Sequence, residues 1–370
     1  MNHLFFELIQ VVLNNRKCLS KTPTPEEWKT LSELATKQSL SGICLSAIQK
    51  MGGNTQVGWR ELGIDQMFYV GWLGKAALIR KRNEELNNQC LELQKKISEA
   101  NIRSCIFKGQ SVGSLYGDLA MLRQPGDIDI YLDCGREKTM SFLKSLGMCN
   151  LKWDYVHTHA PFFTNTTVEV HYSPGAIRNP WKNSRLQKFW QENNEDFFKG
   201  FVTLDRGQIV CPTSKMHIFY LVHHTYRHLI SSGIGLRQLM DVYFALQARD
   251  IEDDPWIQEN VDRFGMKRFC KAMIWVMKEV FGAEIDRLPW TPDEKEGKFL
   301  LDEIMIGGNL GNNDKRFGEG NSKVKMLTQI AKRNWYLAGH YGKDALAAPI
   351  YYIWHYCWKR LHNEIKILNI

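Results

Sequence analysis

The segment "RQPGDIDIYLD", residues 123–133, places two carboxylates in a predicted β-strand. A Pro-Gly pair leads into a β-branched run in which Asp127 and Asp129 alternate with Ile128 and Ile130. Successive side chains of a strand point to opposite faces, so the two carboxylates share one face, about 7 Å apart along the chain. Like charges this close repel each other unless a cation or another partner lies between them. The segment therefore predicts either a metal site or the solvated polar face of an edge strand.

The turn "KGQS", residues 108–111, lies between a predicted short strand and a helix. Gly109 lets the backbone approach a bound group closely, Ser111 offers a hydroxyl, and the N–H groups at the start of a helix attract anions. Lys108 in this turn and Arg123 before the acidic strand are cations of the kind that bind a triphosphate. The alternatives are an ordinary strand-to-helix turn and two solvated surface cations.

A third carboxylate follows in "VEVHY", residues 168–172, where Glu169 and His171 share one face of a predicted strand. If this strand lies beside the acidic strand, Glu169 completes a set of three carboxylates and either binds metal or takes a proton from an attacking hydroxyl. His171 either supports Glu169 by a hydrogen bond or is a structural residue. If the strand pairing is different, Asp133 or Asp154 takes the place of Glu169.

The chain has helical sequence patterns at both ends and a series of predicted short strands between them. One long helical stretch is predicted over about residues 58–99, and the chain from 212 onward is mainly helical. Between them the predicted strands are 103–107, 127–132, 147–154, 160–165 and 166–172, the last two forming a hairpin. The prediction is an α+β protein with a small mixed sheet flanked by helical regions. The predicted domains are an N-terminal helical region at 1–100, an α/β core at 101–210 and a C-terminal helical region at 211–370.

Composition excludes several classes of protein. The 370 residues carry 48 Lys and Arg against 40 Asp and Glu, a net charge of +8 that is compatible with a polyanionic partner but does not require one. The nine cysteines are dispersed and form no C-x-x-C pair, which argues against a disulfide framework and for a reducing cytoplasm. There is no run of 18 apolar residues, so no membrane span or membrane partner is expected.

The order of these motifs resembles that of the nucleotidyltransferase superfamily typified by DNA polymerase beta. That superfamily has a Gly-[Gly/Ser] turn after a strand, an Asp-x-[Asp/Glu] pair and a later third carboxylate. More narrowly, "FKGQSVGSLYGDLAMLRQPGDIDIYL", residues 107–132, resembles the Lys-Gly…Tyr…Arg…Gly-Asp-Ile-Asp signature of an uncharacterised bacterial nucleotidyltransferase-like family. "GLRQLMD", residues 235–241, resembles the helix that follows in that family, and the similarity covers roughly residues 100–245.

The resemblance implies that a nucleoside monophosphate is transferred from an NTP, such as ATP, to a hydroxyl or phosphate of an acceptor, with two Mg²⁺ ions as cofactor. The residues it assigns to catalysis and to metal binding are Asp127, Asp129 and Glu169. It assigns nucleotide binding to Lys108, Gly109, Ser111 and Arg123. His171 and Arg237 are candidates for substrate contact, and the i, i+4 spacing of Arg237 and Asp241 alternatively predicts an ion pair within one helix. The acceptor is left open among a small molecule, a protein and RNA.

A second hypothesis follows from one departure. Gln110 stands directly after Gly109, where the superfamily turn has Gly or Ser. A degenerate copy of the fold would show such a change. The alternative is therefore a catalytically inactive protein of this fold that serves as a nucleotide- or partner-binding scaffold.

Overall fold

The computed structural model describes residues 1–52, 58–284, 286, 288–318 and 323–364. The chain forms two compact units, and each is assembled from three separate segments. The first unit consists of Met1–Gln89, Val112–Gly126 and Ser232–Asn313. The second unit consists of Cys90–Ser111, Asp127–Ser231 and Asp314–Ile370. The predicted boundaries at 100 and 210 divide the chain in linear order, whereas the two units interleave along it.

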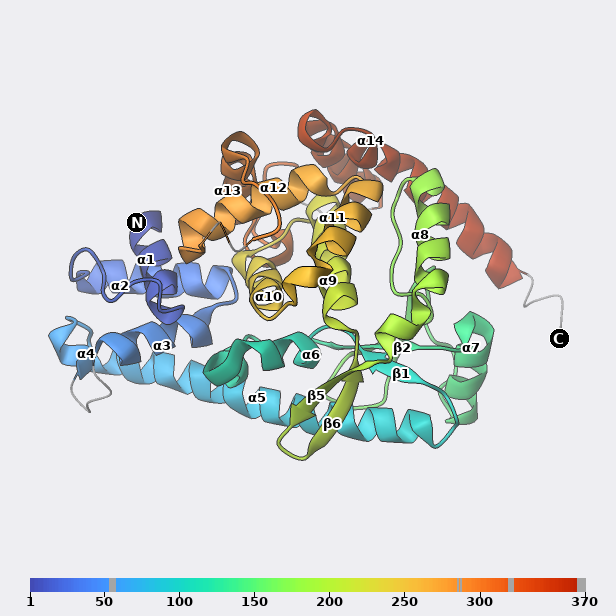
Figure 1. The fold of residues 1–370 in the computed structure, drawn as a ribbon, viewed down its shortest axis with the longest axis horizontal. Helices are drawn as coiled ribbons and strands as arrows, with labels where there is room; N and C mark the ends of the chain where they lie inside the picture. The colour runs from blue at the N-terminus through green and yellow to red at the C-terminus, as the bar shows by residue number, and fades with distance from the viewer. Residues whose placement is uncertain (53–57, 285, 287, 319–322, 365–370) are drawn as a thin grey trace. The chain divides into compact units, whose positions relative to one another are not determined.

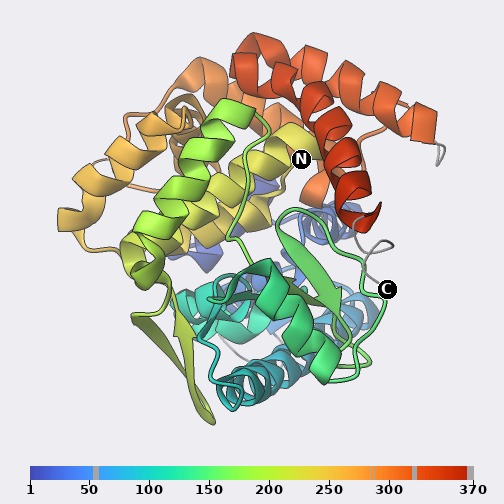
Figure 2. The same ribbon diagram turned by 90° about the vertical axis from the view of Figure 1, so that its right-hand side faces the viewer.

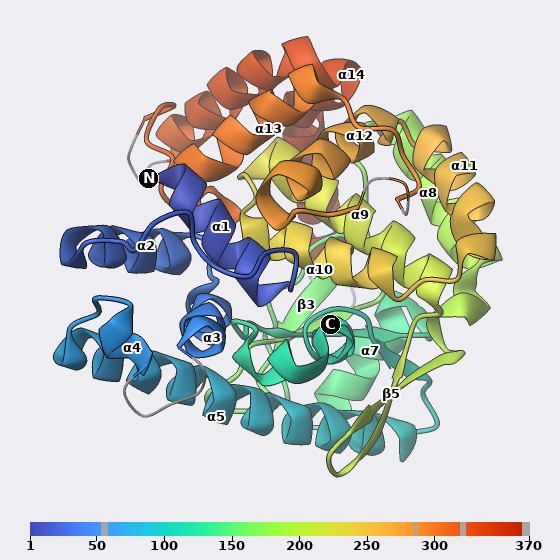
Figure 3. The same cartoon turned by 60° about the vertical axis from the view of Figure 1, so that its left-hand side comes forward.

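The first unit is helical over its described residues. Its elements are α1 (Asn2–Val12), α2 (Pro25–Lys37), α3 (Ser41–Met51), α4 (Gly58–Glu61), most of α5 (Gln66–Ser98), η1 (Ser114–Leu122), α10 (Leu236–Gln247), η3 (Ile251–Asp253), α11 (Asp254–Arg263), α12 (Lys267–Val276), η4 (Met277–Phe281), α13 (Glu294–Gly307) and η6 (Asn309–Gly311). Within it α1 packs beside α3, and α12 packs on α13 (Figure 3). The short α6 (Gln110–Gly113) and α5 each have residues in both units.

The predicted single helix over residues 58–99 is wrong, because the structure has two helices there, α4 and α5. Gly63 lies between them with a φ of +68°, a left-handed conformation that interrupts a helix. Asp65 then accepts a hydrogen bond from the backbone N–H of Phe68 at 3.0 Å and so caps the start of α5.

The second unit contains a four-stranded mixed sheet and a separate hairpin (Figure 1). Its elements are β1 (Ser104–Ile106), β2 (Ile128–Leu132), α7 (Gly135–Ser145), β3 (His157–Ala160), β4 (Val168–His171), α8 (Pro180–Glu192), η2 (Asn194–Phe197), β5 (Gly200–Leu204), β6 (Gly207–Cys211), α9 (Ser214–Ser231) and α14 (Lys323–Glu364). The strand order is β1-β2-β4-β3, with β2 and β4 parallel and the other two pairs antiparallel. A small mixed sheet in a largely helical chain confirms the predicted α+β class.

The sheet has one apolar face and one polar face at β2 and β4. Ile128, Ile130, Val168 and Val170 are each at most 2% exposed and point to the same side. Asp129 and Tyr131 of β2 and Glu169 and His171 of β4 point to the other side. The alternation read from the sequence therefore correctly predicts which side chains share a face.

Two strand predictions need correction. Residues 147–154 do not form a strand, because Gly147 and Asn150 have φ values of +81° and +57°, which no extended strand contains. The predicted hairpin exists, but its first strand is β3 at His157–Ala160 rather than 160–165. Pro161 has no N–H to donate to a ladder, so the strand ends before it.

Helices of the second unit pack against one another beside the sheet. The C-terminal end of helix α8 contacts α9, with the rings of Phe189 and Phe219 4.8 Å apart (Figure 2). Phe107, just after β1, lies edge-on to Tyr220 of α9 at 4.6 Å and to His171 of β4 at 4.8 Å. Among the described helices of the whole chain, none has a stretch long and apolar enough to cross a bilayer.

Candidate metal and nucleotide site

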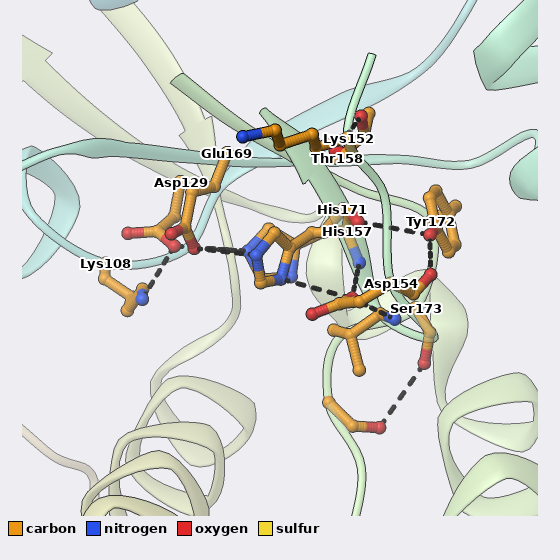
Figure 4. Close-up of polar contacts among 12 residues, drawn as sticks. Lys108, Asp129, Lys152, Asp154, His157, Thr158, Glu169, His171, Tyr172 and Ser173 are labelled. Atoms are coloured by element: carbon orange, nitrogen blue, oxygen red, sulfur yellow. Dashed lines mark hydrogen bonds and ion pairs between the residues drawn. The ribbon is translucent and has the colours of Figure 1, made fainter. Parts of the chain in front are cut away.

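The register of the sheet brings acidic and imidazole side chains together on its polar face (Figure 4). Asp129 of β2 pairs in parallel register with Glu169 of β4, which pairs in antiparallel register with His159 of β3. One row further along, His171 of β4 lies opposite His157 of β3. The expectation that the Glu169 strand lies beside the acidic strand is confirmed.

Asp129 is the buried centre of this group. The residue is 1% exposed, and its Oδ1 atom accepts from the Lys108 ammonium at 2.6 Å and lies 3.2 Å from His171 Nε2. A buried carboxylate needs such partners, because burial of an unpaired charge is costly. The structure thus pairs Lys108, predicted to bind phosphate, with a carboxylate predicted to bind metal.

Glu169 and His171 stabilise each other's charged forms. His171 Nε2 lies 3.5 Å from Glu169 Oε2. Burial alone would raise the pKa of Glu169, but the hydrogen bond from His171 and the charge of Lys108 lower it well below its usual range. Burial alone would lower the pKa of His171, but its hydrogen bonds to Asp129 and Glu169 raise it. His171 Nε2 therefore lies between two carboxylates, and their charges favour the protonated form of its ring.

At Asp127 the unfavourable effects outweigh the favourable charge of Lys108. It directly precedes β2 and is half-buried. The negative charge of Asp129 raises its pKa, and burial raises it further. Two like charges held on one face in this way are the electrostatic condition that a bound cation relieves.

The turn after β1 has the geometry of a close backbone approach. Gly109 has a φ of +63°, and a Cβ there would lie 3.4 Å from the carbonyl oxygen of Asp127. Ser111 is 1% exposed, and its hydroxyl donates to the carbonyl of Lys108 at 3.3 Å and lies 3.5 Å from His217 Nε2. The hydroxyl predicted to seat phosphate is thus enclosed within the second unit, in an α6 that has only four residues.

Arg123 and Arg237 belong to the first unit. Arg123 is 3% exposed and donates from Nε and an Nη to the two oxygens of Asp241 at 2.7 and 2.8 Å. Tyr116 donates to the same carboxylate at 2.6 Å. Arg237 donates to the carbonyl of Gln124 at 3.1 Å. The family motif "GLRQLMD" thus supplies Asp241 as the buried partner of Arg123.

The two alternative carboxylates have other partners. Asp133 accepts from Arg103 Nε at 2.9 Å and from the Asn194 amide at 2.8 Å. Asp154 Oδ1 accepts from the backbone N–H groups of Val156 and His157 at 2.7 and 2.9 Å. Of the three carboxylates considered, Glu169 is the one in register with Asp129.

His157 and His159 were missed by the sequence analysis, which began the hairpin at residue 160. The alternating "HTHA" of residues 157–160 was the available signal, because strand periodicity puts both histidines on one face. Burial and the charge of His171 lower the pKa of His157 to about 4. His157 is therefore a neutral imidazole at physiological pH.

The donor set fits a hard divalent cation. The carboxylates of Asp127, Asp129 and Glu169 supply the oxygen ligands that Mg²⁺ prefers. Within the described residues, ligand atoms of Asp129, Glu169 and His171 lie within 4.8 Å of one another, close enough to share one ion. A cation here would also relieve the repulsion at Asp127.

Comparison with known proteins identifies similar sequences and structures. The model of a family described as uncharacterised nucleotidyltransferase matches residues 24–282, well over half of the chain. An antigenic nucleotidyltransferase-like protein from Paracoccidioides brasiliensis is similar at 15% identity over 49% of this chain and 88% of that one, with a TM-score of 0.32. A CCA-adding enzyme in complex with ATP is similar at 11% identity over 72% of this chain and 77% of that one, with a TM-score of 0.21. The comparison with curated proteins gives no match.

Proposed function

The chain belongs to the family of uncharacterised nucleotidyltransferases, and from this premise we propose that it transfers a nucleoside monophosphate from an NTP to an acceptor hydroxyl or phosphate. The observation that carries the proposal is the alignment of Asp129 with Glu169 on one sheet face, next to an Asp127 whose pKa is raised by its neighbour. This arrangement supports a divalent-metal site of the kind that nucleotidyl transfer uses.

Asp127, Asp129 and Glu169 would hold the metal, for which Mg²⁺ is the best fit to oxygen ligands. Bound Mg²⁺ would neutralise charge on the triphosphate and on the attacking oxygen. His171 keeps Asp129 and Glu169 in place from the side through its hydrogen bonds. We assign Glu169 the role of a ligand, because it is in register with Asp129.

Lys108 is the cation best suited to meet the nucleotide phosphates. It lies beside Asp129, so a metal that neutralises Asp129 would release its ammonium for a phosphate oxygen. Gly109 would allow the backbone to approach the phosphates closely. Ser111 and Arg123 are buried and hydrogen-bonded to other groups of the protein, which favours structural roles over direct contact with phosphate. Ser111 would stabilise the turn, and Arg123 would stabilise the first unit.

The test is a nucleotide-binding titration with and without Mg²⁺, across the four NTPs. Wild type is compared with Asp127→Asn/Asp129→Asn and with a control, Asp205→Asn, whose carboxylate is exposed in the turn between β5 and β6. We expect Mg²⁺-dependent binding in wild type and in the control, and none in the double variant. If no NTP binds to any of the three proteins, with or without Mg²⁺, the proposal is wrong.

A scaffold that binds nucleotide without turnover is the second candidate. Two features favour this candidate: the buried Gln110 after Gly109, and the ion pair between Lys108 and Asp129. Both change how the turn would contact the phosphates of a nucleotide. Release of pyrophosphate separates the two candidates. Release that requires Asp127 and an added acceptor supports the transferase, whereas tight NTP binding without release, whatever acceptor is supplied, supports the scaffold.

All nine cysteines are unpaired, which is typical of proteins in a reducing compartment. We therefore propose the cytoplasm as the place of action, with an NTP and an acceptor as partners. Small molecules, proteins and RNA ends carry suitable hydroxyl or phosphate groups. A screen with α-labelled NTP would identify which of them becomes labelled.

A further inference from the structure

We propose that His157, His159 and Glu169 form a second metal site, which takes a transition-metal ion of the Zn²⁺ class. The site lies on the imidazole side of the same sheet face and goes beyond the proposed transfer reaction, with which it shares only Glu169. Three observations carry the proposal: the spacing of the three ligands, an unpartnered buried nitrogen, and a carboxylate placed behind one histidine.

The first observation is spacing. His159 lies opposite Glu169 in the β3–β4 register, and His157 follows on the same face. One ligand atom from each residue lies within 4.8 Å of the other two, and His157 Nε2 is 3.7 Å from Glu169 Oε2. Zinc–ligand bonds near 2 Å in a tetrahedron put ligand atoms about 3.3 Å apart. Small side-chain rotations would therefore close the site.

The second observation is an unpartnered atom. His157 Nδ1 is buried and has no hydrogen-bond partner among the described residues. Buried polar atoms of native proteins are nearly always satisfied, so an exception calls for an explanation. A bound metal would explain this atom, because Nδ1 would then be the ring nitrogen that points away from the metal in an imidazole ligating through Nε2.

The third observation is the carboxylate behind His157. Asp154 Oδ1 lies 3.7 Å from His157 Nδ1 and is held in place by the N–H groups of Val156 and His157 (Figure 4). A ligating histidine in proteins usually donates its other N–H to a carboxylate or carbonyl, which fixes the ring. Asp154 is placed to receive that hydrogen bond and to leave Nε2 free for the metal.

Access and ligand type decide which ion fits. His159 is exposed, and His157 and Glu169 are half-buried, so an ion can enter from solvent and keep a coordination position for water. Two imidazole nitrogens favour Zn²⁺ and similar ions, whereas Mg²⁺ prefers oxygen ligands. The imidazole site and the carboxylate site would thus select different metals.

The test is a titration of metal-free, full-length protein with Zn²⁺ alone, without nucleotide, in competition with a coloured chelator. We expect one zinc ion to bind wild type. His159→Ala, which removes an exposed ligand with little risk to folding, should weaken that binding about 100-fold or more. Asp154→Asn should weaken it about 10- to 100-fold. His3→Ala, the loss of an 82% exposed histidine on α1, should leave it unchanged.

Cobalt provides an independent readout. Co²⁺ bound to two imidazoles and a carboxylate in four-coordinate geometry gives visible absorption bands, which His159→Ala should abolish. The proposal is overturned if wild type binds no Zn²⁺, or if His159→Ala binds it as tightly as wild type does. It is also overturned if Asp127→Asn abolishes zinc binding, since the ion would then lie among the carboxylates. Because nucleotide is absent, failure of the transferase proposal leaves this result interpretable.

Discussion

Asp127 carries an electrostatic cost in the metal-free protein. Its pKa is raised by the charge of Asp129 and by burial, so folding disfavours its ionised form. At neutral pH, Asp127→Asn should therefore stabilise the protein, by an amount on the order of 1 kcal/mol for one like-charge contact. Urea unfolding in the presence of a chelator measures the difference, with Asp205→Asn as the control that changes an exposed charge.

The sign of its pH dependence follows from the raised pKa. Ionisation of Asp127 opposes folding, so the advantage of the Asn variant should be full above the raised folded-state pKa, shrink as pH falls below it, and vanish below the unfolded-state pKa, about 4. A variant less stable than wild type at pH 7 would mean that the Asp127 carboxylate makes a stabilising contact.

At the scale of single residues, the sequence predicts which face of a strand carries a side chain better than it predicts which residue that side chain contacts. Alternation is local, so it correctly places Asp129 and Glu169 on one face of the sheet and the intervening isoleucines and valines on the opposite, apolar face. The partner of Arg123 could not be predicted, because Asp241 lies 118 residues away and the helical spacing to Arg237 offers a nearer alternative. The metal and nucleotide roles assigned to these side chains stay predictions.

At the scale of elements, errors arise where one residue changes the backbone. Pro161 ends β3 earlier than the apolar pattern suggests, and Asn150 with its positive φ removes a predicted strand. Asn is among the few residues other than glycine that adopt this conformation readily, but nothing in the local pattern requires it to do so. The misplaced β3 is also the reason why His157 and His159 were missed.

The ion pair between Arg123 and Asp241 joins the end of η1 to α10 within the first unit. The side chains are 4% and 9% exposed, so removal of one partner leaves a buried charge uncompensated. Asp241→Asn should lower the free energy of unfolding by about 3–5 kcal/mol. Urea unfolding at pH 7 measures this loss. Arg123→Met/Asp241→Asn is the matched control, and it should recover much of the loss because the charge is gone while Tyr116 keeps its acceptor.

The pH dependence of that pair has the opposite sign to that of Asp127. Burial alone would raise the pKa of Asp241, but the charge and hydrogen bonds of Arg123 lower it. Its stabilising contribution is therefore present above the unfolded-state pKa, about 4, and is lost as pH falls through the lower folded-state value. A gap between wild type and Asp241→Asn that stayed constant down to pH 2 would contradict this account.

At the scale of the whole molecule, the predicted domains follow chain order and the compact units do not. The local pattern of residue types indicates helices and strands, but it does not indicate which distant segments pack together. In the second unit, Gln94 of α5 donates to the carbonyls of Ser104 and Val210, both at 3.1 Å, and so links β1 to β6. Both contacts cross the predicted boundary at 100, and the contact of Phe107 with Tyr220 crosses the one at 210.

A fragment of residues 101–210, the predicted α/β core, should therefore fail to fold. It lacks Gln94, which bridges β1 and β6, and Tyr220, whose ring packs 4.6 Å from Phe107. It also loses α9, whose apolar side chains are buried in the folded chain. Far-ultraviolet circular dichroism and proton NMR should show neither a cooperative thermal transition nor dispersed amide signals.

A fragment of residues 90–231 is the control. It keeps both contacts and should be measurably more ordered. A cooperative transition in the 101–210 fragment would contradict this prediction. It would mean that the strands, α7 and α8 are sufficient for folding, and that the predicted boundaries at 100 and 210 enclose an autonomous domain.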